Sequence, residues 1–136
     1  MKHHIGFGQS DLGADAPQSV ILSGEPERSH YIAQSYLGKL PNGKPILVAT
    51  SGMGAPSLSI VVNELVQVGI KRFIRVGTCG SIQPFILVGD IVISQASLCR
   101  QGAALDIAPP EYPAVADPFL TVALVKTAAK LNIPYH

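Results

Sequence analysis

Apolar residues recur along this chain in short runs that end at glycine-bearing turns. Three of these runs, rich in β-branched residues, predict strands over residues 20–22, 45–50 and 72–77. The stretch between the last two runs has a helical rather than an alternating pattern. Strands that alternate with helices are typical of α/β proteins with a largely parallel sheet. We therefore expect a central mixed sheet, mostly parallel, flanked by helices.

The helical stretch covers residues 56–68. Pro56 suits a first turn, and Gly69 is the expected stop. Its apolar positions follow a spacing of three and four: Leu58, Val61, Val62, Leu65 and Val68. Together with the strands at 45–50 and 72–77, this helix predicts a βαβ unit with parallel strands and a right-handed crossover.

Polar, glycine-bearing turns mark the first third of the chain. The strand at 20–22 ends at Ser23 and Gly24, and the turn over 24–29 is expected to open a helix that contains residues 31–33. A hairpin-type turn at 41–44 precedes the second strand.

The last third alternates less clearly. Residues 86–94 predict a turn and a further strand, and residues 97–117, with three prolines, predict a long ordered loop. A final helix should begin with Asp117 as N-cap and Pro118 in the first turn. Its expected apolar face consists of Leu120, Ala123, Leu124, Ala128 and Leu131. Beyond it, residues 132–134 lead toward another strand.

Composition narrows the class of protein. The 136 residues suffice for one domain over 1–136, and 47% are hydrophobic but only 14% charged, which favours self-association. A net charge of +1 argues against nucleic acid as a partner, and no apolar run approaches the roughly 20 residues that span a membrane. The start resembles no signal peptide, and Cys79 and Cys99 form no disulfide framework, so we expect a cytoplasmic protein.

Arg75 is the anomaly in the apolar pattern. It stands inside a predicted central strand, on the same side as Phe73 and Gly77, where a buried guanidinium needs an anion or a carboxylate. The residues GTCG at 77–80 let the backbone turn and offer amide groups and the hydroxyl of Thr78. An arginine at a glycine-lined strand end favours a phosphate site. The alternative is an ion pair between Arg75 and an internal Asp or Glu.

Gly24 and Arg28 lie in a similar position, after the first strand and near a helix start. Open α/β sheets bind ligands at the carboxyl ends of their strands, and helix starts attract anions. A lone arginine in a first helical turn is ordinarily solvated surface, so the case for Arg28 depends on Arg75 lying at the same sheet edge.

Several blocks, in register over nearly the whole chain, resemble the nucleoside phosphorylase family. They read VILSGEPER at 20–28, TSGMGAPS at 50–57 and RVGTCGSIQP at 75–84. Later segments, AAL at 103–105 and YPAVAD at 112–117, are most similar to the branch that cleaves uridine. The resemblance implies the three-layer fold of that family.

The resemblance also implies chemistry. It assigns a phosphate site to Gly24, Arg28, Arg75 and Thr78, with Arg75 and Thr78 as catalytic residues. The implied reaction is the reversible phosphorolysis of a nucleoside, uridine in the first place, to the free base and ribose 1-phosphate. Inorganic phosphate is then a co-substrate, and no cofactor or metal is expected. The arginines would orient the phosphate, whose charge stabilises the cation-like ribose.

His4 has a role only through this resemblance. The family's N-terminal histidine reaches the ribose 5′-hydroxyl in a neighbouring subunit's site, which implies a homo-oligomer, with a hexamer built of dimers as the first expectation. Without the resemblance, His4 reads as a disordered terminal residue.

The chain departs from the family in two places. Between Ala33 and Gly38 it lacks a piece that normally carries a phosphate-binding arginine given across a dimer interface, and Lys39 and Lys44 have no fork geometry with which to replace it. It also stops at His136, before the segments that hold the base and most of the sugar. We expect a piece of a longer protein, with a true truncation as the alternative.

Other functions stay open. A purine nucleoside phosphorylase is possible because the base-selecting residues would follow His136, whereas a nucleosidase that uses water would not need Arg28 and Arg75. A non-catalytic half-domain that binds phosphate or a partner is the alternative of another class. We expect neither Glu64, late in its helix, nor Glu111, in a proline-rich loop, to act as a general acid.

Overall fold

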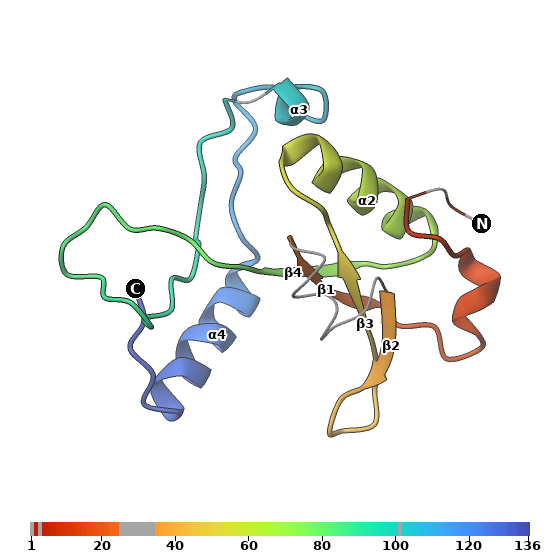
Figure 1. Cartoon of the computed structure of the whole chain (residues 1–136), viewed down its shortest axis with the longest axis horizontal. Helices are drawn as coiled ribbons and strands as arrows, with labels where there is room; N and C mark the ends of the chain where they lie inside the picture. The colour runs from red at the N-terminus through yellow and green to blue at the C-terminus, as the bar shows by residue number, and fades with distance from the viewer. Residues whose placement is uncertain (1, 3, 25–34, 101) are drawn as a thin grey trace. The chain divides into compact units, whose positions relative to one another are not determined.

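The computed structural model describes residues 2, 4–24, 35–100 and 102–136, and its chain forms two compact units. In its described residues the first unit, Met1–Thr78, contains a short 3-10 helix η1 (Gln9–Leu12), four strands and helix α2 (Ala55–Gln67) (Figure 1). The second unit, Cys79–His136, contains the short helix α3 (Gly102–Leu105) and helix α4 (Pro118–Lys130). No described helix is long and apolar enough to cross a membrane.

The first unit is built on a four-stranded sheet in the order β2-β3-β1-β4. Strand β1 (Ser19–Ser23) lies parallel to both β3 (Pro45–Thr50) and β4 (Arg72–Val76), while β2 (Ser35–Lys39) is antiparallel to β3. The mixed, largely parallel sheet expected from the sequence is therefore confirmed. Strands β3 and β4 are parallel as predicted, but they are not neighbours, because β1 lies between them.

The hairpin between β2 and β3 is closed at the predicted turn. The amide of Leu40 donates to the carbonyl of Lys44 at 2.9 Å, and the amide of Gly43 donates to the carbonyl of Leu40 at 2.8 Å. Gly43 has a φ of 79°, a conformation that glycine adopts without strain. Strand β2, which the strand pattern did not single out, is the antiparallel edge that this turn creates.

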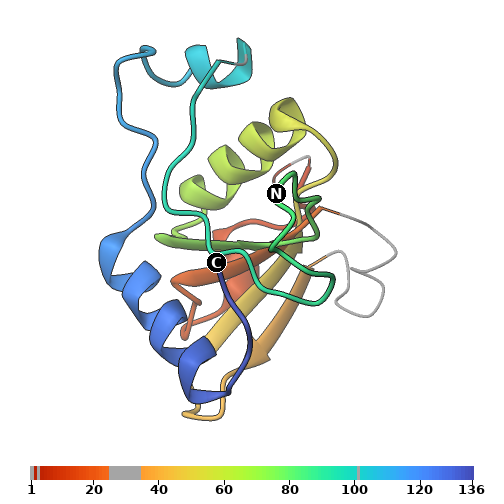
Figure 2. The ribbon, with the colours of Figure 1, turned by 90° about the vertical axis from the view of Figure 1, so that its left-hand side faces the viewer.

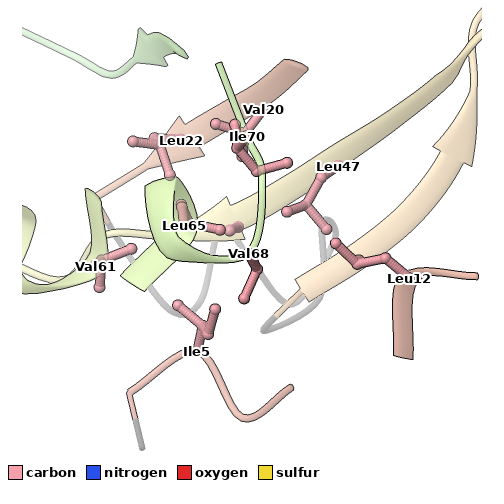
Figure 3. Packing of buried hydrophobic residues seen from close by; sticks show 10 residues of the cluster. Ile5, Leu12, Val20, Leu22, Leu47, Val61, Leu65, Val68 and Ile70 are labelled. Carbon is pink, nitrogen blue, oxygen red and sulfur yellow. The ribbon is translucent and has the colours of Figure 1, made fainter. Parts of the chain in front are cut away.

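Helix α2 (Ala55–Gln67) covers one face of the sheet (Figure 2). It has proline in the first turn and ends before Gly69, whose φ of 100° suits a helix stop, so the predicted bounds are confirmed within one residue. The predicted apolar face of α2 packs against the inward residues of β1 and β3. The buried cluster comprises Ile5, Leu12, Val20, Leu22, Leu47, Ala49, Val61, Leu65, Val68 and Ile70 (Figure 3).

In the second unit the turn predicted within residues 86–94 is confirmed, but the strand predicted to follow it is wrong. The segment turns at residues 87–90, where the Leu87 amide donates to the carboxylate of Asp90 at 2.8 Å, and then forms a single parallel bridge between Ile91 and Tyr135. The amides of Ile91 and Ile93 donate to the carbonyls of Pro134 and His136 at 2.9 Å, so backbone pairing after the turn is confined to residues 91–93 and is too short for a strand.

Helix α4 begins as predicted. The carboxylate of Asp117 accepts a hydrogen bond from the Leu120 amide at 2.8 Å, which caps the helix. The predicted apolar face is largely exposed, and among the described residues of this unit Ala128 is the buried hydrophobic one. The loop over 97–117 contains α3 and a bridge between Ala96 and Val115. The turn and helix predicted over 25–33, with Arg28, lie outside the described residues.

Candidate functional site

A pocket of about 180 Å³ lies at the carboxyl ends of β1 and β4 and the N-terminus of α2, all within the first unit. Parallel strands bring their carboxyl ends to one edge of a sheet, which is why segments distant in sequence meet there. Four of its lining residues are glycines, and the turn before α2 contributes three of the lining residues. The lining consists of Ser23, Gly24, Gly52, Met53, Gly54, Arg75, Gly77 and Thr78.

The guanidinium of Arg75 lies between two glycines in this pocket. Its Nη2 atom is 3.2 Å from the point where a Cβ on Gly24 would stand, and Nη1 is 3.5 Å from the equivalent point on Gly77. A Cβ at residue 24 would crowd the guanidinium, whereas a Cβ at residue 77 would be in van der Waals contact with it. The two glycines therefore give the planar fork of Arg75 room at the strand ends.

Arg75 has no carboxylate partner among the residues that the structure describes. The expectation of a central strand with a buried arginine is wrong, because β4 is at the edge of the described four-stranded sheet and the Arg75 side chain is exposed. No Asp or Glu of the described residues forms an ion pair with it. Arg72, on the same strand, differs, because its Nη2 donates to Oε1 of Gln18 at 3.3 Å. The internal ion pair that was the alternative for Arg75 is thus absent from the described part of the chain, and its fork is free to bind an oxyanion through paired hydrogen bonds.

The loop before α2 forms the opposite wall. Gly52 and Gly54 have φ values of 69° and 85°, and a Cβ on Gly52 would stand 3.2 Å from Cβ of Ser57. Ser51, almost fully buried, ties this loop to the end of β1, since its amide donates to the carbonyl of Ser23 at 2.8 Å. The first-turn amides of α2 have no partners within the helix, so this wall favours negative charge.

Three of the five predicted site residues meet in this pocket: Gly24, Arg75 and Thr78. Arg28 lies outside the described residues. The wall formed by Gly52, Met53 and Gly54 was not among the predicted site residues, although the glycine-bearing turn after a strand, which the sequence displays, was the signal for it.

His4 lies elsewhere, against the C-terminal half of α2. Its ring Nδ1 is 3.0 Å from Oε1 of Glu64, and the backbone amides of His4 and Ile5 both donate to Oε2 of Glu64 at 3.0 Å. The hydrogen bond from the His4 ring, supported by the two backbone amides, holds the pKa of Glu64 below its ordinary value, while burial acts in the opposite direction.

The two carboxylates that we do not expect to act as general acids, Glu64 and Glu111, have other surroundings. Glu64 is occupied by His4 and Ile5, and Glu111 is exposed in a turn that the Tyr112 amide closes onto the carbonyl of Pro109. Neither residue lines the pocket around Arg75. That both lack a catalytic role stays a prediction.

Comparison with known proteins gives a consistent result. The family model described as the phosphorylase superfamily matches residues 12–136. A uridine phosphorylase of Salmonella typhimurium is 40% identical over 148 residues, covering 98% of this chain and 57% of the relative. A uridine phosphorylase of Thermococcus kodakarensis is 36% identical over 151 residues, covering 100% of this chain and 53% of the relative.

A purine nucleoside phosphorylase of the DeoD type from a Thermoanaerobacter species is 42% identical over 113 residues, covering 71% of this chain and 47% of that protein. The chain spans about half the length of the curated relatives that it matches. The family model covers nearly all of the sequence, including both strands that flank the pocket and the arginine between its glycines. The chain therefore belongs to the phosphorylase superfamily.

Proposed function

We propose that this chain supplies the phosphate-binding half of a nucleoside phosphorylase that cleaves uridine reversibly to uracil and ribose 1-phosphate. The observation that carries the proposal is the guanidinium of Arg75, placed between Gly24 and Gly77 and without a carboxylate partner among the described residues. An arginine that no internal acid neutralises suits an anionic substrate. The names of the relatives, most of them uridine phosphorylases, support the choice of nucleoside.

In the proposed reaction a phosphate oxygen forms a bond to the anomeric carbon of the ribose while the bond from that carbon to the base nitrogen breaks. The electron pair of the broken bond goes to the base, which takes up a proton and leaves as uracil. Arg75 and Thr78 are the proposed catalytic residues: Arg75 orients the phosphate, and Thr78 lies where phosphate and sugar meet. The fixed negative charge then stabilises the cation-like ribose of the transition state.

Gly24 belongs to the same proposed phosphate site, because its missing side chain leaves space for both the guanidinium and the anion. Arg28 is the second proposed phosphate ligand. Phosphate is a co-substrate in this proposal, and the reaction uses no other cofactor and no metal. We further propose a cytoplasmic homo-oligomer, a hexamer built of dimers, in which His4 of one copy contacts the ribose 5′-hydroxyl bound to another.

A purine nucleoside is the second candidate substrate, favoured by the 42% identity to the DeoD-type relative. A non-catalytic role in binding phosphate or a partner is a candidate of another class, since the chain spans about half of its relatives' length. Release of ribose in place of ribose 1-phosphate would indicate a nucleosidase.

One assay separates these functions. A protein that contains this chain together with the remaining half of the phosphorylase is incubated with uridine or inosine, with and without inorganic phosphate, and base and sugar products are resolved by chromatography. Uracil and ribose 1-phosphate, formed from uridine only when phosphate is present, are the expected products. Turnover of inosine alone would favour the purine enzyme. Phosphate binding by calorimetry without turnover of either nucleoside would contradict phosphorolysis and favour the binding role.

A further inference from the structure

The Glu64 carboxylate joins the N-terminal segment to helix α2 through both of its oxygens. Oε2 accepts the backbone amides of His4 and Ile5, and Oε1 lies 3.0 Å from Nδ1 of the His4 ring. The Glu64 side chain is only 14% exposed, and the next residue along the segment, Ile5, is part of the buried cluster (Figure 3). Three donors on one carboxylate fix both the backbone and the ring of His4.

An ionised carboxylate accepts hydrogen bonds and cannot donate them. The hydrogen bonds from the His4 ring and from the two amides favour the ionised form of Glu64, which is why the pKa of its carboxyl is lowered. The proton of the His4 ring must then sit on Nδ1, facing Glu64. With the ring proton on Nδ1, the other nitrogen of the neutral ring form, Nε2, has a lone pair that can accept a hydrogen bond.

Nε2 of His4 faces away from this contact. The His4 side chain is 56% exposed, and Nε2 forms no hydrogen bond to any residue in the described part of the chain. We propose that Glu64 is a positioning residue for His4: it holds the ring with the proton on Nδ1 and presents Nε2 as an acceptor for a sugar hydroxyl of the nucleoside. This rests on the proposed function.

The ring cannot serve the pocket of its own copy. The pocket lies at the N-terminus of α2, beside Gly54, and Glu64 stands near the other end of the same helix. Glu64 is nine positions after Ala55 in the helix, a rise of about 13.5 Å. The hydroxyl that His4 accepts from is therefore bound to a second copy of the chain, and Glu64 is a site residue that touches no substrate.

The variant Glu64→Gln tests this proposal because it keeps the hydrogen bonds to the two backbone amides and changes which nitrogen of the His4 ring carries the proton. The amide oxygen of glutamine still accepts the backbone amides of His4 and Ile5, but its NH₂ group then faces Nδ1 and donates to it. The ring proton moves to Nε2, which becomes a donor. Nitrogen-15 spectra of the His4 ring in the whole chain, without substrate, distinguish the two tautomers.

We expect the wild-type ring to carry its proton on Nδ1 and the Glu64→Gln ring to carry it on Nε2. Gln67 provides the matched control: it also binds the N-terminal segment, through Nζ of Lys2, but has no contact with His4. Gln67→Ala should leave the wild-type tautomer in place. A wild-type proton on Nε2, or the same tautomer in wild type and Glu64→Gln, would overturn the role of Glu64.

Kinetics test the sugar contact. With uridine and 5′-deoxyuridine as substrates, loss of the 5′-hydroxyl should lower kcat/KM of the wild type about tenfold, the effect of one hydrogen bond to a positioned group. In His4→Ala and Glu64→Gln the two substrates should differ by less than about twofold, whereas Gln67→Ala should retain the wild-type difference. An unchanged tenfold preference in Glu64→Gln overturns the positioning role.

The two proposals fail in different ways. If the wild type cleaves neither nucleoside, phosphorolysis and the sugar contact are both overturned, while the ring spectra still decide whether Glu64 fixes His4. If the wild type cleaves uridine but prefers it no more than 5′-deoxyuridine, phosphorolysis stands and the contact of His4 with the sugar is overturned.

Discussion

Gly24 and Arg75 fit together because residue 24 has no side chain: Nη2 of Arg75 lies 3.2 Å from the position that a Cβ of residue 24 would occupy. The carbonyl oxygen of Gly52 lies 3.7 Å from the same point. The first strand thus ends where the guanidinium from the fourth strand and the loop from the third converge.

Gly24→Ala should weaken phosphate binding several-fold with little effect on stability. The backbone at Gly24 is not in the left-handed region, so alanine fits its conformation, but the new methyl group displaces the guanidinium of Arg75. Calorimetric titration with phosphate measures the loss. Gly102→Ala is the control, since a Cβ there meets no atom within 4 Å. Equal phosphate affinity in Gly24→Ala and wild type would contradict the placement of the anion.

Arg75→Ala should abolish the stabilisation that phosphate gives, with little change in the melting temperature without phosphate. Each hydrogen bond to a charged group contributes about 1.5–3 kcal/mol, so the dissociation constant of phosphate should rise at least tenfold. Arg75→Lys should restore only part of the phosphate affinity, because an ammonium group lacks the planar fork of a guanidinium.

Thermal melts of Arg75→Ala and of Arg72→Ala, each with and without phosphate, supply the measurement and its control. Arg72 lies on the same strand but bonds to Gln18, away from the pocket, so phosphate should still stabilise Arg72→Ala. A phosphate-free Arg75→Ala protein destabilised by roughly 3–5 kcal/mol would instead indicate a broken internal ion pair.

Leu65→Ala should destabilise the first unit by about 2–5 kcal/mol, the range for truncating a buried leucine. Leu65 is 0% exposed and packs inside the cluster between α2 and the sheet (Figure 3). Denaturant unfolding gives the free energy. Val66→Ala, at the next position of the same helix and 54% exposed, should cost far less. Similar losses in both variants would mean that α2 does not cover the sheet.

The turn at residues 87–90 should loosen at acid pH. The Leu87 amide, followed by the ring of His136 at 2.9 Å, lowers the pKa of Asp90. A carboxyl whose pKa is lowered by folding adds stability above its ordinary pKa and loses it as the pH falls through the lowered value. Amide exchange of Leu87 in the whole chain should therefore accelerate over that acid range.

Asp90→Asn should remove this acid dependence, and the Leu87 amide of the variant should exchange faster already near neutral pH. Asp106→Asn, a change at an exposed carboxylate of the same unit with no hydrogen bond from its side chain to a described residue, should retain it. Acid-dependent exchange that persists in Asp90→Asn would assign the effect to another group.

In the first unit the sequence predicted most of the strands and the helix, but it did not predict which strands lie next to one another. Periodicity located β3, α2 and β4, because a buried helix face and a buried strand leave different spacings of apolar residues. It could not show that β1 separates β3 from β4, since any order of parallel strands buries the same residues. In the second unit the turn within 86–94 was predictable, but the strand expected after it was not, because whether such a segment forms a ladder depends on the backbone groups that face it.

The site was predictable where one strand end carries an unusual residue. Arg75 stood out in an apolar run, and Gly24 and Thr78 followed from the turns beside it. The contact between Glu64 and His4 had no local signal, because the two residues lie far apart in sequence and meet only after α2 has packed on the sheet. Arg28 has no structural test here, since it lies outside the described residues.

The position of β1 has a consequence for how the chain is made. Val20 pairs with Leu47 on one side and Phe73 on the other, so the strand that is synthesised first needs two partners that are synthesised later. Contacts between distant segments form slowly, because each closes a long loop. A nascent chain on the ribosome that has not yet reached β4 therefore exposes one edge of β1, and during that interval it is most vulnerable to pairing with a neighbouring nascent chain.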